Sequence, residues 1–177
     1  MDKGRAAAYI MRTLVPFLVL SSVTSSLTPP SDPDPLILHG DVVIGVLVDL
    51  HRKGATGGCG PIDATTVEDV GAAEWALATI NNQSLHDYPI GLRVYDTCGN
   101  NDIALRQTIR LLQDVVPPNP PLLGVVALSS DSVVSTAVVP LHAFTTPVLV
   151  TQPNIAHKIK ITDNVFSTAP HLTDLLQ

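Results

Sequence analysis

The sequence contains few charged residues, few aromatic residues and only two cysteines. Charged residues make up 15% of the 177 residues, and the formal net charge is −6. A nucleic-acid surface needs a basic patch, and the scattered lysines and arginines provide none, so we expect no nucleic-acid partner. Hydrophobic residues make up 45% of the chain, which is typical of a globular protein and not of a disordered one.

The sequence also lacks the usual signatures of catalysis and of metal binding. It has no Gly-x-Ser-x-Gly elbow, and none of its six histidines has a recognisable catalytic or metal spacing. No histidine pair lies near Cys59 or Cys98, so a four-ligand zinc site is a poor alternative for these two cysteines. We therefore expect no enzymatic activity, no metal and no cofactor.

Residues 1–26 have the pattern of a secretory signal peptide. Three basic residues and an apolar run over 14–20 are followed by small polar residues up to Ser26. The run is shorter than the ~20 residues of a spanning helix, so a single-pass anchor is the weaker alternative. Cleavage would deliver the chain to an oxidising compartment, where Cys59 and Cys98 are expected to form one disulfide.

The part of the chain after this leader is predicted to be a short linker followed by one domain. Residues 27–39 include Pro29 to Pro35, a Pro, Ser and Asp segment that extends neither a helix nor a sheet. About 150 residues remain after the leader, enough for one core and short for two. No second apolar run approaches the length of a membrane span, so residues 40–177 are predicted to form a soluble domain.

Strands and helices alternate along this domain. Apolar runs predict strands over 42–50, 92–95, 122–128 and 147–150. The segments between them predict helices over 67–81, 103–116 and 133–144, and a glycine-rich long loop over 51–66. This alternation requires crossover connections, so the predicted fold class is α/β, with a parallel sheet and helices on both faces.

The spacing of apolar residues predicts which helix faces pack against the sheet. The stripe on 67–81 is Val67, Val70, Ala73, Leu77 and Ile80, and the stripe on 103–116 is Leu105, Ile109, Leu112 and Val116. Glu68 and Asp69 are expected in the first turn of one helix, and the segment 100–102 is expected to cap the other. Trp75 is expected to pack against the sheet or, alternatively, a partner.

Five motifs of this domain can be compared with known protein families by their order and spacing. They are GDVVIGVL at 40–47, the loop at Cys59-Gly60, GAAEWALATINN at 71–82, YDTC at 95–98, and VVSTAV at 133–138 followed by Pro147. Their order and spacing resemble the start of the extracellular ligand-binding domain of class C G-protein-coupled receptors. This group includes the metabotropic glutamate, calcium-sensing, taste and vomeronasal receptors. In that family the intradomain disulfide lies where the two cysteines stand here.

The resemblance implies the first part of lobe one of a two-lobed, periplasmic-binding-protein-like type I fold. Such a clamshell closes on a small amino acid-like or amine ligand and drives a seven-helix signalling domain. The resemblance also implies a homo- or heterodimer formed through lobe one, and coupling to a G protein only if a membrane domain follows. The expected location is the secretory pathway, at the extracellular side of the plasma membrane for a receptor, or secreted if the chain ends at Gln177.

In parallel sheets, ligands bind at the carboxyl ends of the strands, here near 50–51, 129–132 and 151–154. In the family, a serine-rich turn and a Ser/Thr loop at the last two places hold the ligand's carboxylate and amine. The resemblance therefore gives as candidate ligand-binding residues Ser129, Ser130, Asp131, Ser132, Gln152 and Asn154. A helix N-terminus offers free N–H groups to a carboxylate.

Asp131 departs from the family pattern, because amino-acid-binding relatives place a hydroxyl there. Two like charges about 4 Å apart cost roughly 4 kcal/mol at an effective dielectric constant near 20, which argues against binding of an ordinary amino acid carboxylate. Either Asp131 is only a helix N-cap, or it faces the cleft and selects an amine.

One modification site and three functional hypotheses remain open from the sequence. Asn82-Gln83-Ser84 is a glycosylation sequon on a predicted loop. The first hypothesis is the ligand-sensing region of a class C receptor, present as a truncated chain or fragment. The others are a secreted short form that acts as a binding module or decoy, and the ectodomain of a receptor guanylate cyclase or a solute-binding protein.

Overall fold

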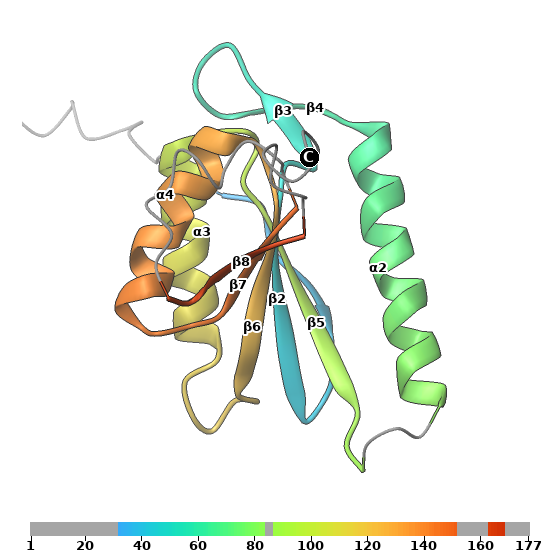
Figure 1. Cartoon of the computed structure of the whole chain (residues 1–177). Helices are drawn as coiled ribbons and strands as arrows, with labels where there is room; N and C mark the ends of the chain where they lie inside the picture. The colour runs from blue at the N-terminus through green and yellow to red at the C-terminus, as the bar shows by residue number, and fades with distance from the viewer. Residues whose placement is uncertain (1–31, 84–86, 152–162, 169–177) are drawn as a thin grey trace, which may run out of the picture. The chain divides into compact units, whose positions relative to one another are not determined.

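A mostly parallel sheet with helices on both faces forms the centre of the fold (Figure 1). The computed structural model describes residues 32–83, 87–151 and 163–168. The sheet has the order β1-β5-β2-β6-β7-β8. Its strands are β1 Leu36–Leu38, β2 Val42–Val48, β5 Ile90–Asp96, β6 Leu122–Leu128, β7 Val148–Val150 and β8 Val165–Ser167. Only β1 runs antiparallel to its neighbour. The predicted α/β class is confirmed.

Strand β2 lies in the middle of the sheet, between β5 and β6. Its sequence is apolar throughout, as a strand covered on both faces must be. Gly45 allows a close approach from one side, because a Cβ at this position would stand 2.7 Å from a Cδ of Leu111 and 3.2 Å from a Cγ of Val125. The helix that carries Leu111 can therefore pack directly onto the strand.

The helices divide between the two faces of the sheet (Figure 1). Helix α2, Ala64–Asn82, covers one face through a cluster that includes Val70 and Leu77. Helices α3, Asn101–Asp114, and α4, Asp131–Ala143, cover the other through a larger cluster. Burial of one such aliphatic side chain contributes about 1.5–3 kcal/mol. Within the described ranges, no helix is both long and apolar enough for a membrane span.

The prediction of one long loop over 51–66 is wrong. Strand β3, His51–Lys53, and strand β4, Cys59–Ile62, pair as an antiparallel hairpin. The turn between them has Gly57 at φ +83°, a conformation that glycine adopts without steric cost. Because the segment is rich in glycine and polar residues and has no apolar alternation, its sequence gives no strand signal.

Helix α2 begins earlier than predicted because Asp63 caps it. The Asp63 carboxylate accepts the N–H of Thr65 at 3.1 Å and the Nε–H of Arg52 at 2.9 Å. The Arg52 hydrogen bond, followed by that of Thr65, lowers the pKa of Asp63. Glu68 and Asp69 therefore lie beyond the first turn, contrary to the prediction.

The predicted packing face of α2 is only partly correct. Val70 and Leu77 are buried, whereas Val67 and Ile80 are exposed. Trp75 is 72% exposed, so the prediction that it packs against the sheet is wrong, and a role at a partner surface stays a prediction. The sequon residue Asn82 is the last residue of the helix and is exposed, so it does not lie on the predicted loop.

The predicted apolar stripe of α3 is wrong except at Leu112, which is half-buried and packs against the larger cluster. Leu105, Ile109 and Val116 are 40%, 43% and 56% exposed. The buried face consists instead of Ile103, Ala104, Gln107, Thr108 and Leu111. Hydrogen bonds offset part of the cost of burying its polar members, because the Thr108 hydroxyl donates to the Ala104 carbonyl at 2.7 Å and the Gln107 side-chain nitrogen donates to the Pro33 carbonyl at 2.8 Å. The buried Gln107 Oε1 has no hydrogen-bond partner among the described residues.

Residues before the predicted domain take part in the fold. Leu36–Leu38, inside the segment predicted as a linker, is strand β1 at the edge of the sheet. Arg106 on α3 holds Asp32 through two hydrogen bonds of 2.7 Å, a bidentate arrangement that favours a fixed geometry. The described part of 27–39 is therefore attached to the sheet and to α3.

Among the described residues, no helix covers the half of this sheet face that lies away from α2. Described residues of β2, β6, β7 and β8 line an apolar groove of about 240 Å³ there. Leu123, Leu149 and Phe166 in its lining are 46%, 36% and 57% exposed. Contiguous exposed apolar surface of this kind commonly marks a binding or interaction site.

A buried polar group joins β5 to the end of α3. The hydroxyl of Tyr95, which is 0% exposed, donates to the Asp114 carboxylate at 2.6 Å. Arg93 donates to the backbone carbonyl of Asp114. Burial, and next the hydrogen bond to Asp114, raises the pKa of the Tyr95 phenol above its ordinary value.

The two faces of α3 give the first prediction. Leu111→Ala should lower the free energy of unfolding by about 2–5 kcal/mol, because it opens a cavity against β2. Leu105→Ala, the same substitution on the exposed face, should change it by less than about 0.5 kcal/mol. Urea unfolding of the secreted chain measures both. Equal losses would show that the predicted stripe, and not the observed face, is packed.

The buried phenol of Tyr95 gives the second prediction. Because its pKa is raised in the folded state, its contribution to stability is complete below the unfolded pKa of about 10 and is lost as the pH rises above it. Between pH 9 and 11, wild type should therefore lose stability more steeply than Tyr95→Phe, approaching a difference of about 1.4 kcal/mol per pH unit above pH 10. Urea unfolding at each pH checks this, with Tyr88→Phe as the control that keeps the wild-type slope.

Candidate functional site

The carboxyl ends of β2, β5 and β6 meet at one edge of the sheet. Val48 is in register with Asp96 on one side and with Leu128 on the other. The next residues, Asp49, Thr97 and Ser129, therefore form a row across the three strands. The Thr97 hydroxyl lies 3.2 Å from that of Ser129 and also donates to the Asp49 carboxylate. This edge is the place where the sequence predicted a ligand site.

Asp49 is the residue of this edge that the sequence analysis missed. One carboxylate oxygen accepts the Thr97 hydroxyl and, at 3.2 Å, the N–H of Gly99. The other accepts the N–H of Ser130 at 3.1 Å. The carboxylate therefore joins the segments that follow β5 and β6. The signal that could have found it is its position, an acidic residue directly after the central buried strand.

The four predicted residues at the start of α4 differ in exposure. Ser129 is 1% exposed, and its hydroxyl donates a hydrogen bond to the Leu47 carbonyl at 3.3 Å. The Ser129 side chain therefore faces the interior. Ser130 and Ser132 are exposed, and Asp131 is half-buried. Ser130 occupies the N-cap position, and Asp131 is the first helical residue. The interpretation of Asp131 as the N-cap is therefore wrong.

The second predicted segment can be placed only in part. Thr151, directly after β7, is half-buried. Gln152 and Asn154 lie outside the described residues. The structure thus brings Ser129 and Ser130 to the row of Asp49 and Thr97, and the contribution of 151–154 stays a prediction.

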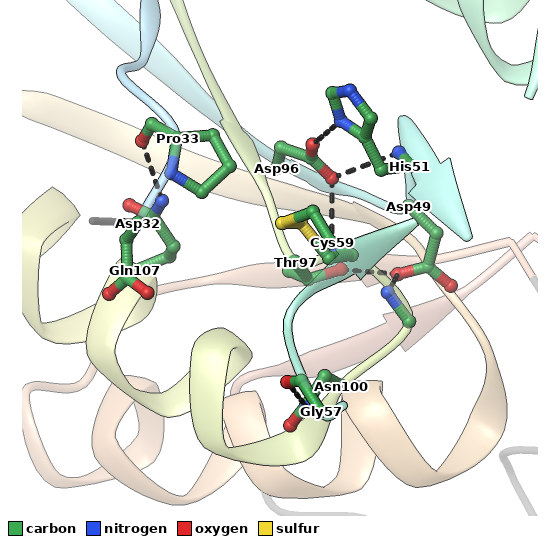
Figure 2. The surroundings of a disulfide bond; sticks show 12 residues. Asp32, Pro33, Asp49, His51, Gly57, Cys59, Asp96, Thr97, Asn100 and Gln107 are labelled. Carbon is green, nitrogen blue, oxygen red and sulfur yellow. Dashed lines mark hydrogen bonds and ion pairs between the residues drawn. A yellow bond between two sulfur atoms is a disulfide. The ribbon is translucent and has the colours of Figure 1, made fainter. Parts of the chain in front are cut away.

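The predicted disulfide between Cys59 and Cys98 is present beside this edge (Figure 2). It joins strand β4 to the segment that follows β5, across 39 positions of sequence. Asn100 adds a second link, because its side chain donates to the Gly57 carbonyl at 2.6 Å. The β3–β4 hairpin is therefore fixed at the carboxyl edge of the sheet.

Asp96 organises the same region from the end of β5 (Figure 2). Its carboxylate accepts the N–H of Cys98 at 2.9 Å and that of His51 at 3.3 Å. It also forms a hydrogen bond with Nδ1 of the His51 ring. Asp96 is 3% exposed, and these contacts account for the burial of its charge.

A group of potential metal ligands in this region does not make a metal centre. Among the residues that the structure describes, His51, Asp96 and Cys98 place one ligand atom each within 4.8 Å of the others. A metal requires the thiolate of a cysteine, and the sulfur of Cys98 is bonded to Cys59. The group is therefore a structural contact of the oxidised chain.

The disulfide gives the third prediction. Closing a loop of this length stabilises a fold by about 4 kcal/mol in the chain-entropy model, so the double variant Cys59→Ser/Cys98→Ser should lose about that much in urea unfolding. Dithiothreitol should destabilise wild type and leave the double variant unchanged. Non-reducing peptide mapping of the secreted chain should recover the two cysteine peptides joined, and two free thiols there would contradict the assignment.

The chain is similar to metabotropic glutamate receptors over about half of its length. A probable metabotropic glutamate receptor of Caenorhabditis elegans is 34% identical over 95 residues, which are 51% of this chain. The metabotropic glutamate receptor of Drosophila melanogaster is 30% identical over 54% of the chain, and metabotropic glutamate receptor 8 of Mus musculus is 30% identical over 45%. No family model matches the chain.

The matches cover only a small part of each relative, so the properties of the whole relatives do not follow for this chain. The matched segments cover 10%, 10% and 9% of the three relatives, so the chain spans about a tenth of the length of the curated relatives it matches. All three relatives are receptors by name and not enzymes, in agreement with the expectation that this chain is not an enzyme. The resemblance to class C G-protein-coupled receptors that the sequence predicted is thus confirmed for about half of the chain, by similarity to metabotropic glutamate receptors of a nematode, an insect and a mammal.

Proposed function

We propose that this chain belongs to the extracellular ligand-sensing region of a class C receptor. Three features support the proposal: the similarity to metabotropic glutamate receptors, the α/β sheet with helices on both faces, and the disulfide between Cys59 and Cys98. The chain then enters the secretory pathway and acts at the extracellular side of the plasma membrane. Coupling to a G protein requires a membrane domain in the same polypeptide.

The main observation in support of the proposal is the arrangement of polar side chains at the start of α4. Ser130 and Ser132 are exposed there, at the carboxyl edge of a parallel sheet, which is where α/β folds bind small molecules. In the proposed function, Ser130, Asp131 and Ser132 form the lobe-one wall of the ligand site. Ser129 supports that wall from inside. Gln152 and Asn154 complete it, and the ligand is a small amine or an amino acid-like molecule.

The exposed side chains of α2 provide a surface for the proposed dimer. Trp75 is 72% exposed, whereas Val70 and Leu77, which pack against the sheet, are each 7% exposed. Tryptophan is enriched among the residues that dominate protein interfaces. The proposed partner is a second receptor chain, of the same or a related kind, bound through lobe one.

The fourth prediction tests ligand binding by the secreted chain. Isothermal titration with the common amino acids and their decarboxylated amines should detect saturable binding of at least one compound. The double variant Ser130→Ala/Ser132→Ala should bind that compound at least tenfold more weakly, because hydrogen bonds to a charged ligand are lost.

Ser135→Ala is the matched control on the same helix. The Ser135 hydroxyl donates to the Asp131 carbonyl at 2.7 Å, so it is used inside the helix and its loss should leave the affinity unchanged. Absence of binding by every compound would contradict a ligand site in this chain. Equal weakening by the control would show that the wall is not the site.

The coding sequence beyond Gln177 distinguishes a secreted decoy from a receptor. Sequencing of the native transcript through its 3′ end separates them. A reading frame that continues into a second lobe and seven apolar helices supports the receptor. A stop directly after Gln177 supports the secreted short form, and a kinase-like and cyclase segment supports the receptor cyclase.

A further inference from the structure

The first N–H group of the candidate site already has an anionic partner inside the protein. Ser130 is the N-cap of α4, and its N–H donates to the Asp49 carboxylate at 3.1 Å. No hydrogen bond joins the Ser130 side chain to the helix as a cap. Asp49 therefore accepts one of the N–H groups that this helix N-terminus would otherwise offer to a ligand carboxylate.

The Asp49 carboxylate is held in place by donors from two segments. Thr97 and Gly99, after β5, donate to one oxygen, and Ser130 donates to the other. All three are hydrogen-bond donors, as an acceptor-only carboxylate requires. Moving Asp49 aside would remove the acceptor of the Gly99 and Ser130 N–H groups. The Thr97 hydroxyl would keep the Val48 carbonyl, at 3.1 Å, as an acceptor. An incoming anion therefore meets a fixed negative charge.

A second acidic residue adjoins the N–H group that Asp49 accepts. Asp131 is half-buried at the first position of α4, directly after the N–H that Asp49 accepts. Carboxylates repel a ligand carboxylate and attract an ammonium group at short range. The same edge that could hold an amino acid by its carboxylate thus carries two acidic side chains.

We propose that Asp49 determines the ligand class of this site by excluding free carboxylates, so that the site takes small cationic amines. This inference rests on the proposed function, because it names the ligand class of the same wall. Asp49 acts in two ways. It positions the start of α4 against the end of β5, and it supplies the charge that separates an amine from the amino acid with the same side chain.

The first test uses two minimal probes, acetate and methylammonium, on the secreted full chain. The backbone amide resonances of Ser130, Asp131 and Ser132 are followed by nuclear magnetic resonance during each titration. In wild type, methylammonium should shift them saturably and acetate should not. In Asp49→Asn, which keeps the shape and removes the charge, acetate should shift them and the affinity for methylammonium should fall at least tenfold.

Asp41→Asn is the matched control for the change in net charge. Asp41 is exposed and precedes β2 at the opposite end of the same strand, so this variant should respond as wild type does. Asp49→Glu should restore the exclusion of acetate at least in part, which a purely structural role of Asp49 would not require. If Asp49→Asn does not fold, Asp49→Ser removes the same charge.

The wild-type titration alone can overturn the inference. Saturable shifts of these three amides by acetate in wild type would do so. An acetate response of Asp49→Asn equal to that of wild type would also overturn it. The compound panel separates this inference from the proposed function. Binding of an amino acid without binding of its decarboxylated amine keeps the proposed function and overturns the role of Asp49. Absence of binding by every compound, methylammonium included, would overturn both.

Discussion

The fold depends on the burial of strand β2 between two neighbours and between helices on both faces. A strand in this position has no face in contact with water, so its side chains must be apolar, and its backbone groups must pair on both edges. Both requirements are met through β5 and β6. The resulting register places Asp49, Thr97 and Ser129 in one row, and this row supports the start of α4. The candidate site is thus a consequence of strand register.

The hairpin after β2 adds covalent and polar links to the same edge. The disulfide between Cys59 and Cys98 ties strand β4 to the residues after β5, and Asp96 ties His51 to the same place. A bridge of this kind restricts the unfolded chain more than it strengthens the folded one. It also holds a short hairpin that has few apolar side chains of its own. The β3–β4 hairpin therefore stabilises the edge of the sheet that contains the candidate site.

Negative charge distinguishes this edge from a simple anion-binding helix terminus. The N–H of Ser130 would attract a carboxylate in isolation, yet Asp49 accepts it and Asp131 is the next residue. Similarity to metabotropic glutamate receptors supports a ligand-sensing role for the region, while the local chemistry of this chain governs which ligand fits. Family resemblance and ligand class are therefore separate questions, and they depend on different residues.

The sequence by itself determined the order of the main elements and the cysteine pairing. Strand β6 was predicted with its observed bounds, 122–128, because a continuous apolar run between turn residues leaves few alternatives. The disulfide followed from the presence of only two cysteines in a chain with a predicted leader. A cap of α3 from the segment 100–102 was also predicted, because a cap depends on a few neighbouring residues, and Asn100 is the residue that forms it.

Tertiary structure decided what depends on partners distant in sequence. The buried face of α3 includes Gln107, whose amide is paired by the carbonyl of Pro33, 74 positions away. The spacing of apolar residues along the chain carries no information about such a contact. The prediction based on that spacing therefore gave the wrong packing face of α3. Asp49 was missed for a related reason. Its position after the central strand marks it as an edge residue, but its hydrogen-bond partners lie after two other strands and reach it only when the parallel sheet is assembled. Local patterns fix the elements, whereas register and buried hydrogen bonds fix the site.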